Sequence, residues 1–231
     1  MITITDLHCA YGDKPVLNIP NYTLAQGVHG IVGLNGAGKT TLLNALYGFG
    51  RNTSAQVRWK ETDMGRWNTA FQEAESYFYP GITGDEYLEL FMQGGGTAHL
   101  PGLHELLELP LDQLITTYST GMRRKLAILG ALHLDREVLL LDEPMNGLDL
   151  ASVRVVEAIV RKLGERGHTV LITSHVLGPL VTLCDRIHVL KAGTFARSFE
   201  RGHTEGLEEA LFTELDARTR SVVAGWTNAP E

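Results

Sequence analysis

The chain has 231 residues, 44% hydrophobic and 20% charged, a composition that excludes a disordered protein and fits one globular unit. Its net charge of −7 excludes the basic surface that nucleic-acid binding needs, so no nucleic-acid partner is expected. No run of 18 apolar residues and no signal-peptide pattern occurs, so we expect a cytoplasmic protein without a membrane span. Cys9 and Cys184 lack metal-ligand spacing and are expected to be reduced packing residues.

Alternating apolar residues and turn signals predict a β-rich beginning of the chain. A turn is expected at 11–15, and a glycine-rich loop at 33–38 precedes a helix at 39–47. The ranges expected to be strands in this part are 2–8, 16–24, 28–32, 55–60 and 66–71. The glycine-rich loop is therefore expected to join a strand to a helix.

The next stretch changes to a helical pattern. Short helices are predicted at 85–93 and 104–109, with breaks at the glycines of 94–96 and the Pro-Gly pair of 101–102. A longer helix is predicted to begin at Ser119, because a serine side chain can cap the free backbone donors of a first turn.

From residue 138 onward, strands and helices are predicted to alternate. The apolar run 138–141 is ended by acids and is typical of a strand buried on both faces. Apolar residues at helical spacing predict a helix over 150–163. Further strands are expected at 169–173 and 187–190, with a helix between them.

The end of the chain is predicted to be an amphipathic helix at 206–217 and a loose tail at 218–231. Together the elements predict an α/β fold. Its catalytic core would comprise 1–74 and 134–205, a helical insertion would occupy 75–133, and 206–231 would follow as a helix and tail.

The glycine-rich loop and the start of the next helix fill the phosphate-loop pattern G-x-x-x-x-G-K-[ST]. The residues of this pattern are Gly33, Leu34, Asn35, Gly36, Ala37, Gly38, Lys39, Thr40 and Thr41. Backbone N–H groups of such a loop converge on polyphosphate, and the helix adds the positive end of its dipole. Lys39 would reach the terminal phosphates of ATP, and the Thr40 hydroxyl would ligate Mg²⁺. A chance glycine turn is the alternative, and the strand–loop–helix context disfavours it.

Two carboxylates follow the buried strand 138–141. Asp142 is expected to orient Mg²⁺ through water, because magnesium keeps part of its hydration shell. Glu143 is the candidate general base for the attacking water. Taken alone, the pair would be interpreted as a solvated acidic turn, but the phosphate loop in the same chain favours the catalytic interpretation.

The segment Tyr118-Ser119-Thr120-Gly121-Met122, about twenty residues before the acids, resembles the signature motif of ABC ATPases, usually Leu-Ser-Gly-Gly-Gln. Ser119 and Gly121 match this motif, whereas the other three residues depart from it. Thr120 adds a side chain where the family often has glycine, and Met122 cannot make the polar contacts of glutamine.

Other residues occur in the order of the same family, and the resemblance covers roughly residues 2–200. Tyr11 resembles the aromatic that stacks on adenine, and Gln72 resembles the glutamine that senses Mg²⁺ and communicates with the membrane partner. Asp149 falls in a segment similar to the D-loop, and His175 resembles the switch histidine that contacts the terminal phosphate. Taken alone, Tyr11 would be interpreted as a turn aromatic and Gln72 as a surface amide. Asp149 would be interpreted as a helix cap, and His175 as a core or capping histidine.

The resemblance implies a cassette with a RecA-like core, an N-terminal antiparallel β subdomain and a helical subdomain. It implies that Ser119 and Gly121 close the ATP site of a second subunit, either an identical copy or a paralogue. It also implies a separate transmembrane permease, docked near Gln72 on the cytoplasmic face of the cell membrane. The segment 79–88 and the signature segment look more like those of exporters than of importers.

Two other functions compete with ATP-driven transport. One is a non-transport ABC ATPase with a single cassette, such as an iron–sulfur assembly ATPase, which would have soluble partners. The other is a different phosphate-loop enzyme, such as a small-molecule kinase, against which the signature-like segment and His175 argue.

Overall fold

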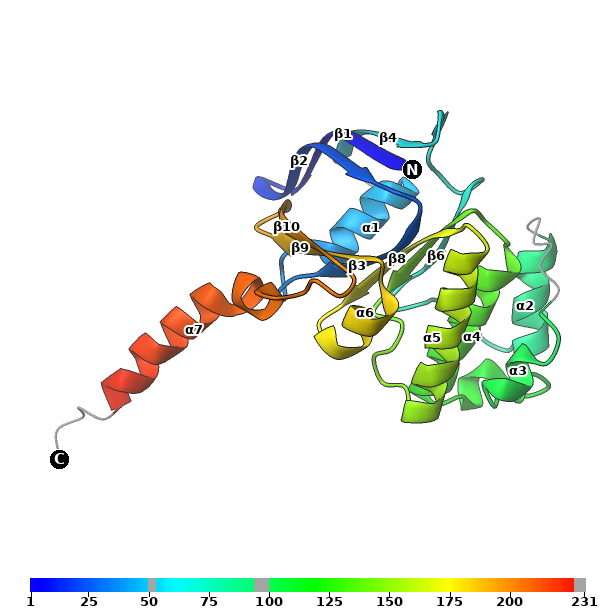
Figure 1. The fold of residues 1–231 in the computed structure, drawn as a ribbon. Helices are drawn as coiled ribbons and strands as arrows, with labels where there is room; N and C mark the ends of the chain where they lie inside the picture. The colour runs from blue at the N-terminus through cyan, green and yellow to red at the C-terminus, as the bar shows by residue number, and fades with distance from the viewer. Residues whose placement is uncertain (50–52, 94–99, 227–231) are drawn as a thin grey trace.

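A computed structural model describes residues 1–49, 53–93 and 100–226, which fold into two β-sheets with flanking helices (Figure 1). The strands are β1 (Ile2–Tyr11), β2 (Lys14–Leu24), β3 (Gly27–Val32), β4 (Thr53–Trp59), β5 (Thr62–Asp63), β6 (Thr69–Gln72), β7 (Val138–Asp142), β8 (Thr169–Ser174), β9 (Arg186–Lys191) and β10 (Thr194–Glu200). The helices are α1 (Lys39–Tyr47), α2 (Gly84–Gln93), α3 (Leu103–Leu106), the 3₁₀ turn η1 (Ile115–Thr117), α4 (Thr120–His133), α5 (Leu150–Glu165), α6 (Leu177–Leu183) and α7 (Leu207–Trp226).

The larger sheet has the strand order β10-β9-β3-β8-β7-β6, and only its edge strand β10 runs antiparallel to its neighbour. All five residues of β7 are buried, as expected for a strand covered on both faces. The parallel register sets Gln72 opposite Leu141 and Asp142 opposite Thr173. The carboxyl ends of β3, β6, β7 and β8 therefore meet at one edge, where α/β sheets bind ligands.

The smaller sheet is antiparallel, with the order β2-β1-β4-β5. Helix α1 lies between the two sheets (Figure 1), and one hydrophobic cluster joins all three layers. It includes Ile4 of β1, Leu42 and Leu46 of α1, and Leu140 of β7. Helix α1, which follows the phosphate loop, is therefore held by packing against one sheet on each side.

Helices α2, α3 and α4 form a group with a hydrophobic cluster of their own (Figure 1). Tyr87 of α2 and Leu126 of α4 are buried in it, and the Tyr118 hydroxyl donates a hydrogen bond to the Pro110 carbonyl at 2.7 Å. Gly130 lets the two long helices approach, because an added Cβ would lie 2.7 Å from the Phe91 ring. Helices α5 and α6 instead pack on the larger sheet through a third cluster.

Most predicted elements are confirmed, but several differ. The helix predicted at 104–109 ends at Leu106, and β5 and η1 were not predicted. The strand expected at 66–71 is shorter, at Thr69–Gln72, and β10 was not predicted, since among its residues only Phe199 is fully buried. The tail prediction is wrong for 218–226, because α7 continues to Trp226 and runs away from both sheets (Figure 1). Residues 227–231 and the glycine break at 94–96 lie outside the described residues.

No helix in the described ranges is both long enough and apolar enough to cross a membrane.

Candidate nucleotide site

The phosphate loop adopts the conformation that its glycines permit. Gly38 has a φ of 102°, which an L-side chain rarely adopts, and a Cβ on Gly33 would lie 2.4 Å from the Leu190 carbonyl oxygen. Lys39 is buried, and its Nζ donates to the Gly33 carbonyl at 2.8 Å across the loop. Helix α1 begins at Lys39 without a side-chain cap. Its first-turn N–H groups therefore face the loop as an anion site.

A cleft of about 620 Å³ opens over this loop. Its lining comprises Tyr11, Lys14, Pro15, Val16, Asn35, Gly36, Gly38, Lys39, Thr40, Thr41, Glu143, Ala192 and Gly193. The side chain of Tyr11 is 63% exposed, and its hydroxyl lies 3.5 Å from Oγ1 of Thr41. An exposed aromatic ring beside the phosphate loop can stack on a planar base.

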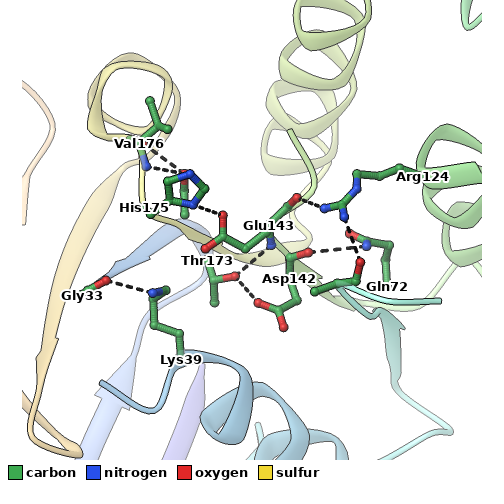
Figure 2. Close-up of polar contacts among 11 residues, drawn as sticks. Gly33, Lys39, Gln72, Arg124, Asp142, Glu143, Thr173, His175 and Val176 are labelled. Carbon is green, nitrogen blue, oxygen red and sulfur yellow. Dashed lines mark hydrogen bonds and ion pairs between the residues drawn. The ribbon is translucent and has the colours of Figure 1, made fainter. Parts of the chain in front are cut away.

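Asp142 and Glu143 are held at the edge of the sheet by Thr173 of β8 (Figure 2). The Thr173 hydroxyl donates to Oδ1 of the buried Asp142 at 2.5 Å and accepts from the Glu143 N–H at 2.9 Å. Glu143 has a positive φ of 51°, so the backbone leaves the extended strand conformation at this residue. Its Oε2 lies 2.6 Å from Nδ1 of His175, so two of the three predicted catalytic side chains face each other (Figure 2).

Gln72 reaches the same edge from β6. Its Nε2 donates to the Glu73 carbonyl at 2.5 Å and lies 3.5 Å from the Asp142 carbonyl. Oε1 of Gln72 and Oδ2 of Asp142 are both buried without a hydrogen-bond partner among the described residues. Such oxygens suit a hard cation like Mg²⁺.

The described residues contain no group of three His, Cys, Asp or Glu side chains that could hold a metal. Two free oxygens from Gln72 and Asp142, with the Thr40 hydroxyl in the cleft, instead fit a cation that keeps much of its hydration shell and binds phosphate. The residues present therefore fit Mg²⁺ bound together with a nucleotide.

A family model described as ABC transporter matches residues 17–146, which is more than half of the chain. This chain belongs to the ABC transporter ATP-binding family.

Relatives and solved structures agree with this assignment. The chain is 30% identical to the bacitracin transport ATP-binding protein BcrA of Enterococcus faecalis, over 95% of this chain and 72% of that protein. It is 33% identical to the cobalt import ATP-binding protein CbiO of Salmonella typhi, over 93% of this chain and 88% of that protein. A dimeric bacterial ABC transporter cassette, MJ0796, shares the fold with a TM-score of 0.77 at 22% identity, over 87% of this chain and 98% of that one. The chain is therefore an ATP-binding ABC ATPase.

The ABC signature segment does not line the cleft of its own chain. Ser119 caps α4, as predicted, and its Oγ accepts from the Met122 N–H at 3.2 Å. An added Cβ on Gly121 would lie 3.1 Å from the Gly147 carbonyl oxygen, so the signature segment packs against the segment that resembles the D-loop. Asp149 of that segment caps α5 by accepting from the Ser152 N–H at 2.8 Å. These three site predictions thus lie apart from the phosphate loop.

Several residues at the site were not singled out from the sequence. Thr173 ends an apolar strand, and only its register opposite Asp142 reveals its role. Gly193 lines the cleft because the turn between β9 and β10 lies against β2. A Cβ on Gly193 would lie 2.1 Å from the Val16 carbonyl oxygen. The only local signal for this turn is the Ala192-Gly193 pair itself, because glycine is typical of hairpin turns.

Proposed function

We propose that this chain powers transport, in the export direction, through a separate membrane permease. The observation that carries the proposal is the place of Gln72. Its amide lies at the Asp142 carbonyl, and its side chain also lines a second, larger groove of about 870 Å³. One residue thus links the nucleotide site to a surface on which a partner can act.

The proposed chemistry uses the side chains at the edge of the sheet. The phosphate-loop N–H groups and Lys39 hold the phosphates of ATP, and Tyr11 stacks on the adenine. Glu143 takes a proton from a water whose oxygen attacks the γ-phosphorus, so that the bond to the β-phosphate oxygen breaks and ADP leaves. His175 orients the Glu143 carboxylate and contacts the terminal phosphate.

Thr40, Gln72 and Asp142 are the residues that would hold Mg²⁺, with Asp142 acting through water. The ion would neutralise charge on the phosphates.

The signature segment is proposed to act on a second subunit. Since Ser119 and Gly121 do not line the cleft of their own chain, they are free to offer a hydroxyl and a backbone N–H to ATP held by a facing copy or paralogue. The N-terminus of α4 would add about 0.3–1 kcal/mol of favourable dipole interaction with that anion. Asp149, beside this segment, would lie at the same interface. Two ATP molecules would then be enclosed between two subunits.

The larger groove is proposed to receive the permease. It is bordered by aromatic side chains, of which Tyr77 and Tyr79 are largely exposed. Such a surface suits an apolar segment of a partner. The subunit would then sit peripherally on the cytoplasmic face of the membrane.

We also propose that 75–133 forms a helical subdomain inserted into a catalytic core of 1–74 and 134–205, with 206–231 as an appendage.

Export is favoured over import by the exporter-like segments at 79–88 and 118–122. The decisive experiment captures the tagged chain from native membranes and reconstitutes it with the permease that co-purifies. ATP added on the side of the cassette should drive the cargo of that permease to the opposite side, and a Tyr77→Ala/Tyr79→Ala variant should lose the permease. Cargo movement towards the cassette would reverse the direction, and exclusively soluble partners would indicate a non-transport ATPase.

A further inference from the structure

Arg124 joins two loops at the carboxyl edge of the sheet. Its side chain projects from the second turn of α4, and its Nη1 donates to the Glu143 carbonyl. Its Nη2 donates to the Ala74 carbonyl at 2.9 Å. Figure 2 shows the guanidinium between the segment that follows Asp142 and the segment that follows Gln72. One side chain therefore fixes the first residues after two neighbouring parallel strands, β6 and β7.

The bond to Glu143 matters because that backbone has a conformation that few residues adopt. With a φ of 51°, Glu143 lies in the left-handed region, and such geometry persists only where the surroundings hold it. Thr173 holds its N–H from β8, and Arg124 holds its carbonyl from α4. Since these backbone angles set the direction in which the Glu143 side chain leaves the backbone, both contacts help to aim its carboxylate.

The bond to Ala74 connects the same guanidinium to the larger groove. Gln72, Glu73 and Ser76 line that groove on either side of Ala74. A shift of this segment would move the Ala74 carbonyl and, with it, the guanidinium that this carbonyl holds. Because the guanidinium is rigid, the shift would also reach the Glu143 carbonyl. Arg124 is thus placed between the surface proposed for the partner and the backbone of Glu143.

We infer that Arg124 is a positioning residue for hydrolysis, which holds Glu143 in its productive orientation and ties that orientation to the segment after Gln72. This inference rests on the proposed role of Glu143 as general base. A lysine cannot replace the fork, because its single ammonium cannot copy a planar group that bridges two carbonyls.

The test compares Arg124→Met and Arg124→Lys with the unmodified chain in steady-state hydrolysis of Mg-ATP. Arg124→Met should lower kcat by about 10–100-fold, as expected when a catalytic group is misplaced by about 1 Å. KM for ATP should stay within about twofold, because the phosphate loop is untouched. Arg124→Lys should give an intermediate kcat.

Arg201→Met is the matched control. Arg201 also donates to two carbonyls, those of Cys184 at 3.1 Å and Leu183 at 2.8 Å, but it lies outside the nucleotide site. Its replacement removes two comparable bonds to carbonyls, together with an ion pair to Asp185 at 3.0 Å, and should leave kcat unchanged. If Arg124→Met does not fold, as judged by its melting curve, Arg124→Lys is compared with the control by the same criterion. An unchanged kcat in the folded Arg124 variants overturns the inference.

Combination with Glu143→Gln separates this inference from the proposed function. If Arg124 acts through Glu143, the residual rate of Glu143→Gln should not fall further when Arg124→Met is added. An additional fall of about tenfold or more would show that Arg124 acts independently, and would overturn the inference while leaving the general base in place. Near-normal turnover by Glu143→Gln alone would instead refute the proposed role of Glu143.

Discussion

At the scale of single residues, the site combines local strain with contacts that offset it. A left-handed conformation costs a non-glycine residue such as Glu143 about 1–2 kcal/mol. The hydrogen bond from its N–H to Thr173, the bond from Arg124 to its carbonyl and the contact of its carboxylate with His175 all act on this one residue. Strain held in this way at a sheet edge is typical of a functional position.

Lys39 provides the most direct test of the phosphate loop. Its buried ammonium is held only by the Gly33 carbonyl among the hydrogen bonds of the described residues, so a bound phosphate can attract it without breaking an ion pair. Lys39→Ala should lower the affinity for ATP by about tenfold or more, since a charge-assisted contact contributes about 1.5–3 kcal/mol. Binding can be measured by titration with a fluorescent ATP analogue. Lys162→Ala, which removes a surface lysine paired with Glu165, should bind ATP normally. Equal affinities for the two variants would contradict the loop assignment.

At the scale of elements, a chain of hydrogen bonds joins the two sheets. The Tyr22 hydroxyl of β2 lies 2.8 Å from Nδ1 of His188 on β9, and Nε2 of His188 lies 3.0 Å from Nδ1 of His29 on β3. Burial, and then the neighbouring His29 and Arg186, lower the pKa of His188 to about 3. Burial also lowers the pKa of His29. Both side chains are therefore neutral in the folded protein at neutral pH.

These neutral histidines make the stability depend on pH. Below about pH 6.5 the unfolded chain binds protons that the folded chain excludes, so the free energy of unfolding falls as the pH falls towards 3. His188 alone contributes a slope of up to about 1.4 kcal/mol per pH unit in this window. His188→Gln should flatten the slope between pH 7 and 5, measured by urea unfolding, whatever its effect at pH 7. His203→Gln, at an exposed histidine, should keep the original slope, and an unchanged slope in His188→Gln would contradict this assignment.

How far the sequence predicts this structure depends on whether a feature is local. The phosphate loop, the buried strand before Asp142 and the Ser119 cap are encoded within a few residues, and their elements were predicted closely. Thr173 and Arg124 reach the site through sheet register and helix packing, which no local pattern contains. Similarly, α7 continues beyond 217 through β-branched residues and a glycine, which have weak helix propensity.

At the scale of the whole molecule, the separation of Ser119 and Gly121 from the phosphate loop is the decisive feature. One chain supplies the loop, the carboxylates and His175, but its signature segment does not line that cleft. In the proposed dimer, ATP held by one subunit would be enclosed when a second subunit presents its α4. Hydrolysis would then remove the bridging phosphate and favour separation, which would couple the chemical step to movement of a partner.

The most direct measurement is the molar mass of Glu143→Gln in saturating Mg-ATP, obtained by light scattering during size-exclusion chromatography. If Glu143 is the general base, as proposed, this variant should bind ATP but hydrolyse it slowly. We therefore expect a dimer of two 25.4 kDa chains, which separates when ATP is replaced by ADP. Adding Ser119→Arg, which places a bulky cation in the signature segment, should prevent the dimer while leaving ATP bound. A single-chain mass for Glu143→Gln at ATP concentrations that fill the site would contradict the shared-site account.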